Sequence, residues 1–296
     1  MNLTSPPTTE TVEAPQPAQT TNIALPLLLV LAAYPTWLAM TTAPAMLVAP
    51  VAVCAYWLLL RRKLYFVAGL LTALCLFKPE WLPFLALPGF IFGGVQFFGG
   101  VALAALAAFF GAQAMHMPLD LTTLAGLNGV APVHTMQNFG AMLALILGEN
   151  TPNLQIGTLA CYAVAFVSST ELWWRMHQIA DSHTKYLKKC AATSLIMLTT
   201  SMHTSMLDYI VLVPVLVWLW QATADDIKDN GGLVRNVIVA YPLMTWAYFG
   251  LQAAAPTLSL PLYFVWAVVL SVCVLPTLDV ETNRILNARF KTQSPS

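Results

Sequence analysis

The chain has 296 residues, of which 58% are hydrophobic and only 9% are charged, and its mean hydropathy is +0.70. Soluble domains carry a charge on roughly a quarter of their residues, so this composition excludes an ordinary soluble protein and predicts that lipid covers much of the surface. The formal net charge is zero, and the few basic residues stand in short groups beside apolar runs, which argues against nucleic-acid binding.

Residues 1–22 are rich in Thr, Pro, Ala and Gln and contain no Lys or Arg, so we expect a disordered cytoplasmic tail. The tail lacks the basic region and small-residue cleavage site of a secretory signal, so the first helix is expected to remain in the mature protein. Residues 23–278 are expected to form a polytopic membrane domain, and residues 279–296 a second cytoplasmic tail.

The membrane domain contains about ten apolar stretches that approach the ~20 residues a spanning helix needs. The sequence therefore predicts an all-α integral membrane protein with about ten transmembrane helices. The expected spans are 23–40, 44–60, 64–77, 81–97, 98–116, 154–169, 190–202, 207–221, 233–252 and 258–275.

Residues 117–153 break this pattern, because prolines and the turn pair Asn128-Gly129 interrupt any long helix. The apolar run 139–147 inside this segment is too short to cross a bilayer. We therefore expect one broken external segment that includes a short interfacial helix.

The distribution of the basic residues tests this predicted membrane topology. If the amino terminus is cytoplasmic and ten spans alternate, both termini lie inside and 12 of the 13 Lys and Arg residues face the cytoplasm. This asymmetry is what the positive-inside rule demands of a multi-pass inner-membrane protein. The external face then holds the remaining cation and seven other ionisable residues. They are Lys78, Glu80, His116, Asp120, His134, Glu149, His203 and Asp208.

Lys78-Pro79-Glu80 places a cation and a carboxylate at the external interface. An ammonium there can stabilise the charge that develops on a leaving phosphate, such as that of a lipid carrier. The alternative is an interfacial lysine that snorkels and pairs with Glu80.

His203 and Asp208 stand at the external junction between the seventh and eighth spans. Five residues apart, they converge only if the chain turns between them, and the carboxylate could then orient the imidazole for acid or base catalysis. The alternative is a helix cap beside an interfacial histidine.

Gln137-Asn138 introduce the short interfacial helix. Their amides could bind sugar hydroxyls, although amides also cap helices. The five cysteines stand singly, with no C-x-x-C pair and no histidine at zinc spacing, so the sequence predicts packing residues and no metal site. They are Cys54, Cys75, Cys161, Cys190 and Cys273.

Taken in order, short motifs between residues 34 and 220 resemble those of the family-87 membrane glycosyltransferases, polyprenyl-phosphate-mannose-dependent members of the GT-C superfamily. The family has an A-G-L-L...K-P-Q block, an N-Q-S-like element and an H-x-x-Y-D-like element. The matching stretches here are Tyr34-Pro35-Thr36-Trp37, Leu60-Arg61-Arg62-Lys63, Ala68-Gly69-Leu70-Leu71, Lys78-Pro79-Glu80, Met136-Gln137-Asn138, and His203 with Asp208-Tyr209 and Pro214.

The resemblance implies a GT-C-like fold and an enzyme that transfers a hexose, with mannose expected, from a polyprenyl-phosphate donor to a lipid or glycan acceptor at the external face. No cofactor is implied, because the lipid-linked sugar is itself the substrate. On this reading His203 and Asp208 are catalytic, and the substrate-binding residues are Lys78, Glu80, Gln137, Asn138 and Tyr209.

The chain departs from the family pattern in three places, one of which is Thr42-Ala43-Pro44 in place of the G-Q element usual after the Y-P-x-W block. The family's catalytic aspartate lies in the first external loop, whereas the only early carboxylates here, Glu10 and Glu13, fall in the expected cytoplasmic tail. The Gln of K-P-Q is Glu80. The alternative function is therefore a non-catalytic or truncated family member that binds the lipid carrier as a subunit, with a second polypeptide supplying the missing part.

Overall fold

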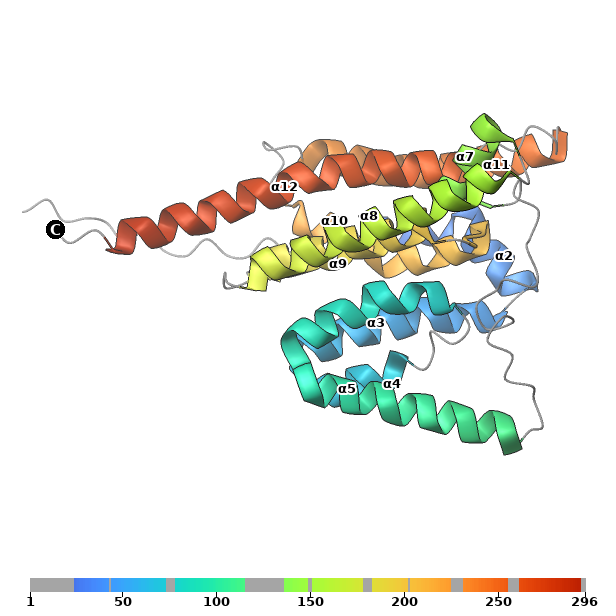
Figure 1. The fold of residues 1–296 in the computed structure, drawn as a ribbon. Coiled ribbons are helices and arrows are strands. Elements are labelled where there is room, and N and C mark those ends of the chain that lie inside the picture. Colours follow the sequence, from blue (N-terminus) through green and yellow to red (C-terminus); the bar gives the residue numbers. More distant parts are fainter. Residues whose placement is uncertain are drawn as a thin grey trace, which may run out of the picture.

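The computed structural model describes residues 24–42, 44–72, 78–114, 136–148, 151–177, 183–201, 203–224, 231–254 and 261–293. These residues are almost all helical, and none of them forms a strand (Figure 1). The tail 1–22, Cys75 and most of the broken segment, with His116, Asp120, His134 and Glu149, lie outside the described residues. The helices are α1 Ala24–Leu31, α2 Tyr34–Thr42, η1 Pro44–Leu47, α3 Val48–Arg61, α4 Tyr65–Leu71, η3 Pro79–Trp81, α5 Leu82–Ala114, α7 Phe139–Leu147, α8 Pro152–His177, α9 His183–Thr200, η5 Met206–Val211, α10 Leu212–Ala222, α11 Gly232–Ala254 and α12 Leu262–Gln293.

Several of these helices are long and apolar enough to cross a membrane. Three stretches meet both criteria, namely Pro79–Gly111, Pro152–Trp174 and Gly232–Ala254. The pair α1 and α2, bent by 57°, makes a fourth if it is one broken span. Shorter apolar helices cover Val48–Arg61, Met206–Ala222 and Leu262–Pro276. The described chain is therefore consistent with a helical membrane protein, while the number of ten crossings stays a prediction.

The long helix α5 contains a sharp break. Its 33 residues include one with non-helical backbone, Gly94, at φ 48° and ψ −124°. Glycine tolerates this positive φ because it has no Cβ. Figure 1 shows the ribbon turning back on itself within α5. The sequence predicted a boundary between spans 81–97 and 98–116, whereas the break lies at Gly94.

The second half of α5 packs closely on the short helix α4. A Cβ at Gly69 would overlap the carbonyl oxygen of Phe97 and lie 2.9 Å from the backbone nitrogen of Val101. A Cβ at Gly100 would overlap the carbonyl oxygen of Phe66. Small residues that let two backbones approach are typical of helix packing in membranes.

Helix α9 lies at the centre of the bundle. It packs against α8, α10 and α12, and side chains on all of its faces are buried. Its 18 residues span about 27 Å at ~1.5 Å per residue, close to the ~30 Å thickness of a bilayer's hydrocarbon core. Residues at the two ends of α9 are therefore about one membrane thickness apart.

The turn that ends α3 contains three consecutive basic residues, 61–63. Lys63 adopts a left-handed conformation at φ 58°, and the amides of Lys63 and Leu64 donate to the carbonyls of Leu60 and Leu59. This pair of bonds is a Schellman motif, in which a lysine occupies the position usually held by glycine. The motif turns the chain at the Arg61-Arg62 pair and returns it into α4.

The close approach of α4 and α5 predicts a selective effect of adding one methyl group. Gly69→Ala should destabilise the protein by about 3 kcal/mol, because backbone atoms block the new Cβ. Gly111→Ala, also in α5, is the matched control, because a Cβ there meets nothing within 4 Å. Thermal unfolding of the purified variants in detergent measures both effects. Equal melting temperatures for Gly69→Ala and Gly111→Ala would contradict the packing described.

Candidate functional site

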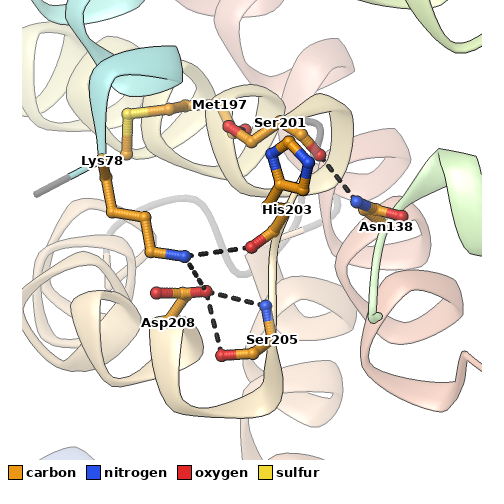
Figure 2. A network of polar contacts seen from close by, with 7 residues as sticks. All are labelled: Lys78, Asn138, Met197, Ser201, His203, Ser205 and Asp208. Carbon is orange, nitrogen blue, oxygen red and sulfur yellow. Dashed lines mark hydrogen bonds and ion pairs between the residues drawn. The ribbon is translucent and has the colours of Figure 1, made fainter. Parts of the chain in front are cut away.

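An ion pair joins two distant segments at one end of the bundle. The Lys78 Nζ lies 3.0 Å from Asp208 Oδ2 and also donates to the carbonyl oxygen of His203, again at 3.0 Å (Figure 2). Lys78 precedes η3 and Asp208 lies within η5, 130 residues further along the chain. The structure therefore brings Lys78, His203 and Asp208 together, as the sequence predicts.

The two partners differ in their exposure. The Asp208 side chain is 1% exposed, whereas that of Lys78 is 24% exposed. The Asp208 Oδ2 also accepts from the backbone nitrogen of Ser205 at 2.7 Å and from the Ser205 hydroxyl at 3.0 Å. A burial this deep is costly for a carboxylate unless a cation and hydrogen bonds compensate it, and Oδ2 has both. The second oxygen, Oδ1, is buried with no hydrogen-bond partner among the described residues.

The imidazole of His203 is available for other contacts. The residue is half-buried, and Figure 2 shows its ring pointing away from the Asp208 carboxylate. The proposed orientation of the imidazole by Asp208 is therefore not found, because the carboxylate binds Lys78 and Ser205 instead. His203 contributes its backbone carbonyl to the ion pair and leaves its ring at the edge of the cluster.

Glu80 does not form the alternative pair with Lys78 that the sequence allowed. Its backbone carbonyl accepts from the Tyr162 hydroxyl at 2.7 Å, which ties η3 to α8. Its Oε1 atom is buried and makes no hydrogen bond among the described residues. Because Lys78 pairs with Asp208, the Glu80 carboxylate takes no part in this ion pair.

Gln137 and Asn138 anchor the start of α7. Both are fully buried. Asn138 Oδ1 accepts from the amide of Ala141 at 2.9 Å, which makes Asn138 the N-cap of α7, and its Nδ2 donates to the carbonyl of Ser201. The capping alternative is thus confirmed for Asn138. A role for either amide in sugar binding stays a prediction.

Gln137 connects four parts of the fold. Its side-chain amide donates to the Tyr248 hydroxyl at 3.1 Å, and its Oε1 accepts from the amide of Tyr263. Its backbone amide donates to Thr204 and its carbonyl accepts from the Tyr209 hydroxyl, both at 2.7 Å. Tyr209 is fully buried, so it holds the loop from inside the protein.

Sequence reasoning missed the residues that complete this end of the bundle. Ser205 and Asp208 form a capping box at the start of η5, and their S-x-x-D spacing was a readable signal. Tyr248 and Tyr263 carry no such local signal, because they come from α11 and α12. Their ring centroids lie 5.1 Å apart, and the Tyr263 centroid lies 5.0 Å from that of Tyr209.

No metal centre is evident in the described part of the chain, where no group of three His, Cys, Asp or Glu side chains could hold an ion. Comparisons with protein-family models, with curated proteins and with solved structures found no match.

The ion pair predicts a specific stability coupling. Lys78→Met leaves the Asp208 carboxylate buried and uncompensated, so it should cost about 2 kcal/mol or more of unfolding free energy. Asp208→Asn should also destabilise, and the double variant should lose less than the sum of the two single losses. Unfolding of all four proteins in the same detergent measures this coupling. Strict additivity would show that the pair contributes nothing to the fold.

Proposed function

We propose that this chain is a membrane glycosyltransferase that transfers a hexose, with mannose the expected sugar, from a polyprenyl-phosphate donor to a lipid or glycan acceptor. The observation that carries the proposal is the partly exposed Lys78 ammonium, which binds the Asp208 carboxylate and the backbone carbonyl of His203. Lys78 and Asp208 belong to segments that also carry the family-like motifs.

The proposed role of Lys78 is to bind the phosphate of the donor. An ammonium has three N–H donors, and two are directed at Asp208 and at the carbonyl of His203. The third remains for a phosphate oxygen, and the lysine is held by the His203 carbonyl and by Asp208, which Ser205 holds in turn. Such a preorganised cation stabilises the charge that grows on a leaving phosphate.

The proposed reaction is a single displacement. The acceptor hydroxyl oxygen forms a bond to the anomeric carbon of the hexose as the bond from that carbon to the phosphate oxygen breaks. The hydroxyl proton passes to a base, for which we propose the His203 imidazole, and the electron pair of the broken bond leaves on the polyprenyl phosphate beside Lys78. Inversion at the anomeric carbon follows.

The proposal also includes the side of the membrane at which the Lys78 ion pair lies. With about ten crossings in a GT-C-like arrangement and both termini in the cytoplasm, the Lys78 end lies at the external face of the inner membrane. The prenyl chain then lies among the helices while the sugar meets water at the interface. A small apolar crevice beside Trp81, lined by α3, α4 and α5, supports this arrangement.

Transfer of radiolabelled mannose from polyprenyl-phosphate-mannose to membrane lipids tests the proposal. Lys78→Ala, His203→Ala and Asp208→Asn are each expected to lower the rate at least 100-fold, while Lys63→Ala, an exposed lysine beyond α3, keeps it within twofold. Expression and melting temperature of each variant separate lost chemistry from lost folding. Normal transfer by all three variants would remove these residues from the active site.

A second candidate function is a lipid-carrier-binding subunit without catalysis. The burial of Asp208 Oδ1 and Glu80 Oε1 favours it, because neither carboxylate oxygen is open to a substrate hydroxyl in this arrangement. Purified chain with polyprenyl-phosphate-mannose distinguishes the two. Saturable binding that Lys78→Ala abolishes, without any turnover, would establish the subunit and exclude the transferase.

A further inference from the structure

A cavity of about 190 Å³ lies at the start of α9, a helix that spans about 27 Å and ends just before the loop that carries His203. The end of α3, the start of α9 and the end of α10 enclose it. Its polar side chains are Arg61, His183 and Gln221, and the rings of Trp57, Tyr186 and Trp218 form much of the wall. No carboxylate is among the described residues that line it.

The hydrogen-bond donors in this cavity are arranged by one contact. Arg61 Nη1 donates to His183 Nδ1, and the guanidinium carbon lies 5.9 Å from the centroid of the Tyr186 ring. Because Nδ1 accepts this bond, the proton of the neutral imidazole is on Nε2, which is then a donor. Burial and the charge of Arg61 both lower the pKa of His183, which keeps the ring neutral near pH 7.

Most of the N–H donors in this cavity make no hydrogen bond among the described residues. A guanidinium has five N–H groups, of which the bond to His183 takes one. The Gln221 side-chain amide makes no hydrogen bond among the described residues and adds two further N–H groups. The cavity therefore presents a fixed positive charge and several N–H donors, and none of the described residues that line it carries a carboxylate.

We propose that this cavity binds a phosphate ester group at the membrane surface opposite to the Lys78 site. A planar guanidinium matches two phosphate oxygens at once, and the imidazole and amide supply the remaining donors. The volume is far above the ~15 Å³ needed for one water and below the ~300 Å³ typical of larger ligand pockets. It suits a phosphate with a short ester arm and excludes a whole nucleotide.

The surroundings favour a membrane lipid as the source of the phosphate. Leu58 lines the cavity and is also 48% exposed, so the cavity borders the apolar surface that faces lipid. An acyl chain can lie along this surface while its headgroup enters.

Binding to the full-length chain in neutral detergent tests the proposal with three probes. They are inorganic phosphate, short-chain phosphatidic acid with two six-carbon chains, and the corresponding phosphatidylcholine as the zwitterionic control. We expect saturable binding of the phosphatidic acid, at least 10-fold tighter than either other probe. Equal affinity for inorganic phosphate would keep the site and assign it to a free phosphate instead.

Two neighbouring arginines provide a matched pair of variants. Arg61→Gln should weaken binding of the phosphatidic acid at least 10-fold, whereas Arg62→Gln, which does not line the cavity, should change it less than twofold. Gln221→Leu removes two donors without a change of charge and should weaken binding about threefold, which covers the case in which Arg61→Gln folds poorly. Equal effects of both arginine variants, or no saturable binding of any probe, would overturn the proposal.

Discussion

The cost of placing a charge in hydrocarbon is the constraint on which this structure depends. An unpaired ionic group at the bilayer centre costs at least about 2.5 kcal/mol, so a membrane protein keeps its charges at its two ends or pairs them. The Lys78–Asp208 pair is an instance of the second solution, since its carboxylate is almost completely buried. Ser205 supports that carboxylate, and the loop before η5 is therefore fixed to the segment before η3.

Helix α9 relates the two polar ends of the molecule. His183 begins the helix beside Arg61, and Ser201, directly after its last residue, binds Asn138 near the Lys78 ion pair. The two polar regions have opposite characters. One contains a compensated ion pair with buried carboxylates, and the other contains an arginine that has only neutral groups beside it among the described residues lining the cavity. On the basis of this difference we propose different ligands for them, a lipid-linked sugar at one end and an anionic headgroup at the other.

The sequence predicted the parts of the site that charge and hydropathy determine. Lys78, His203 and Asp208 could be grouped because the predicted membrane topology places few ionisable residues at the external face. Helix α7 was expected because a short apolar run follows two amide side chains. The partner of Lys78 was not predictable, because choosing Asp208 over Glu80 depends on how η3 and η5 meet in space. The same holds for Gln137, whose partners Tyr248 and Tyr263 follow it by more than 100 residues. The break in α5 was predicted between Phe97 and Phe98 but lies at Gly94, because two glycine pairs flank this stretch and only the backbone conformation shows which one bends.

Side-specific cysteine labelling tests most directly whether the two ends lie at opposite membrane surfaces. In a chain whose five cysteines are replaced by alanine, Thr42→Cys marks the end where α2 meets η5, and Arg62→Cys marks the end of α3. Both positions are exposed. A membrane-impermeant maleimide should label Thr42→Cys in intact spheroplasts and Arg62→Cys only after the membrane is opened. Labelling of both positions from the same side would contradict the account.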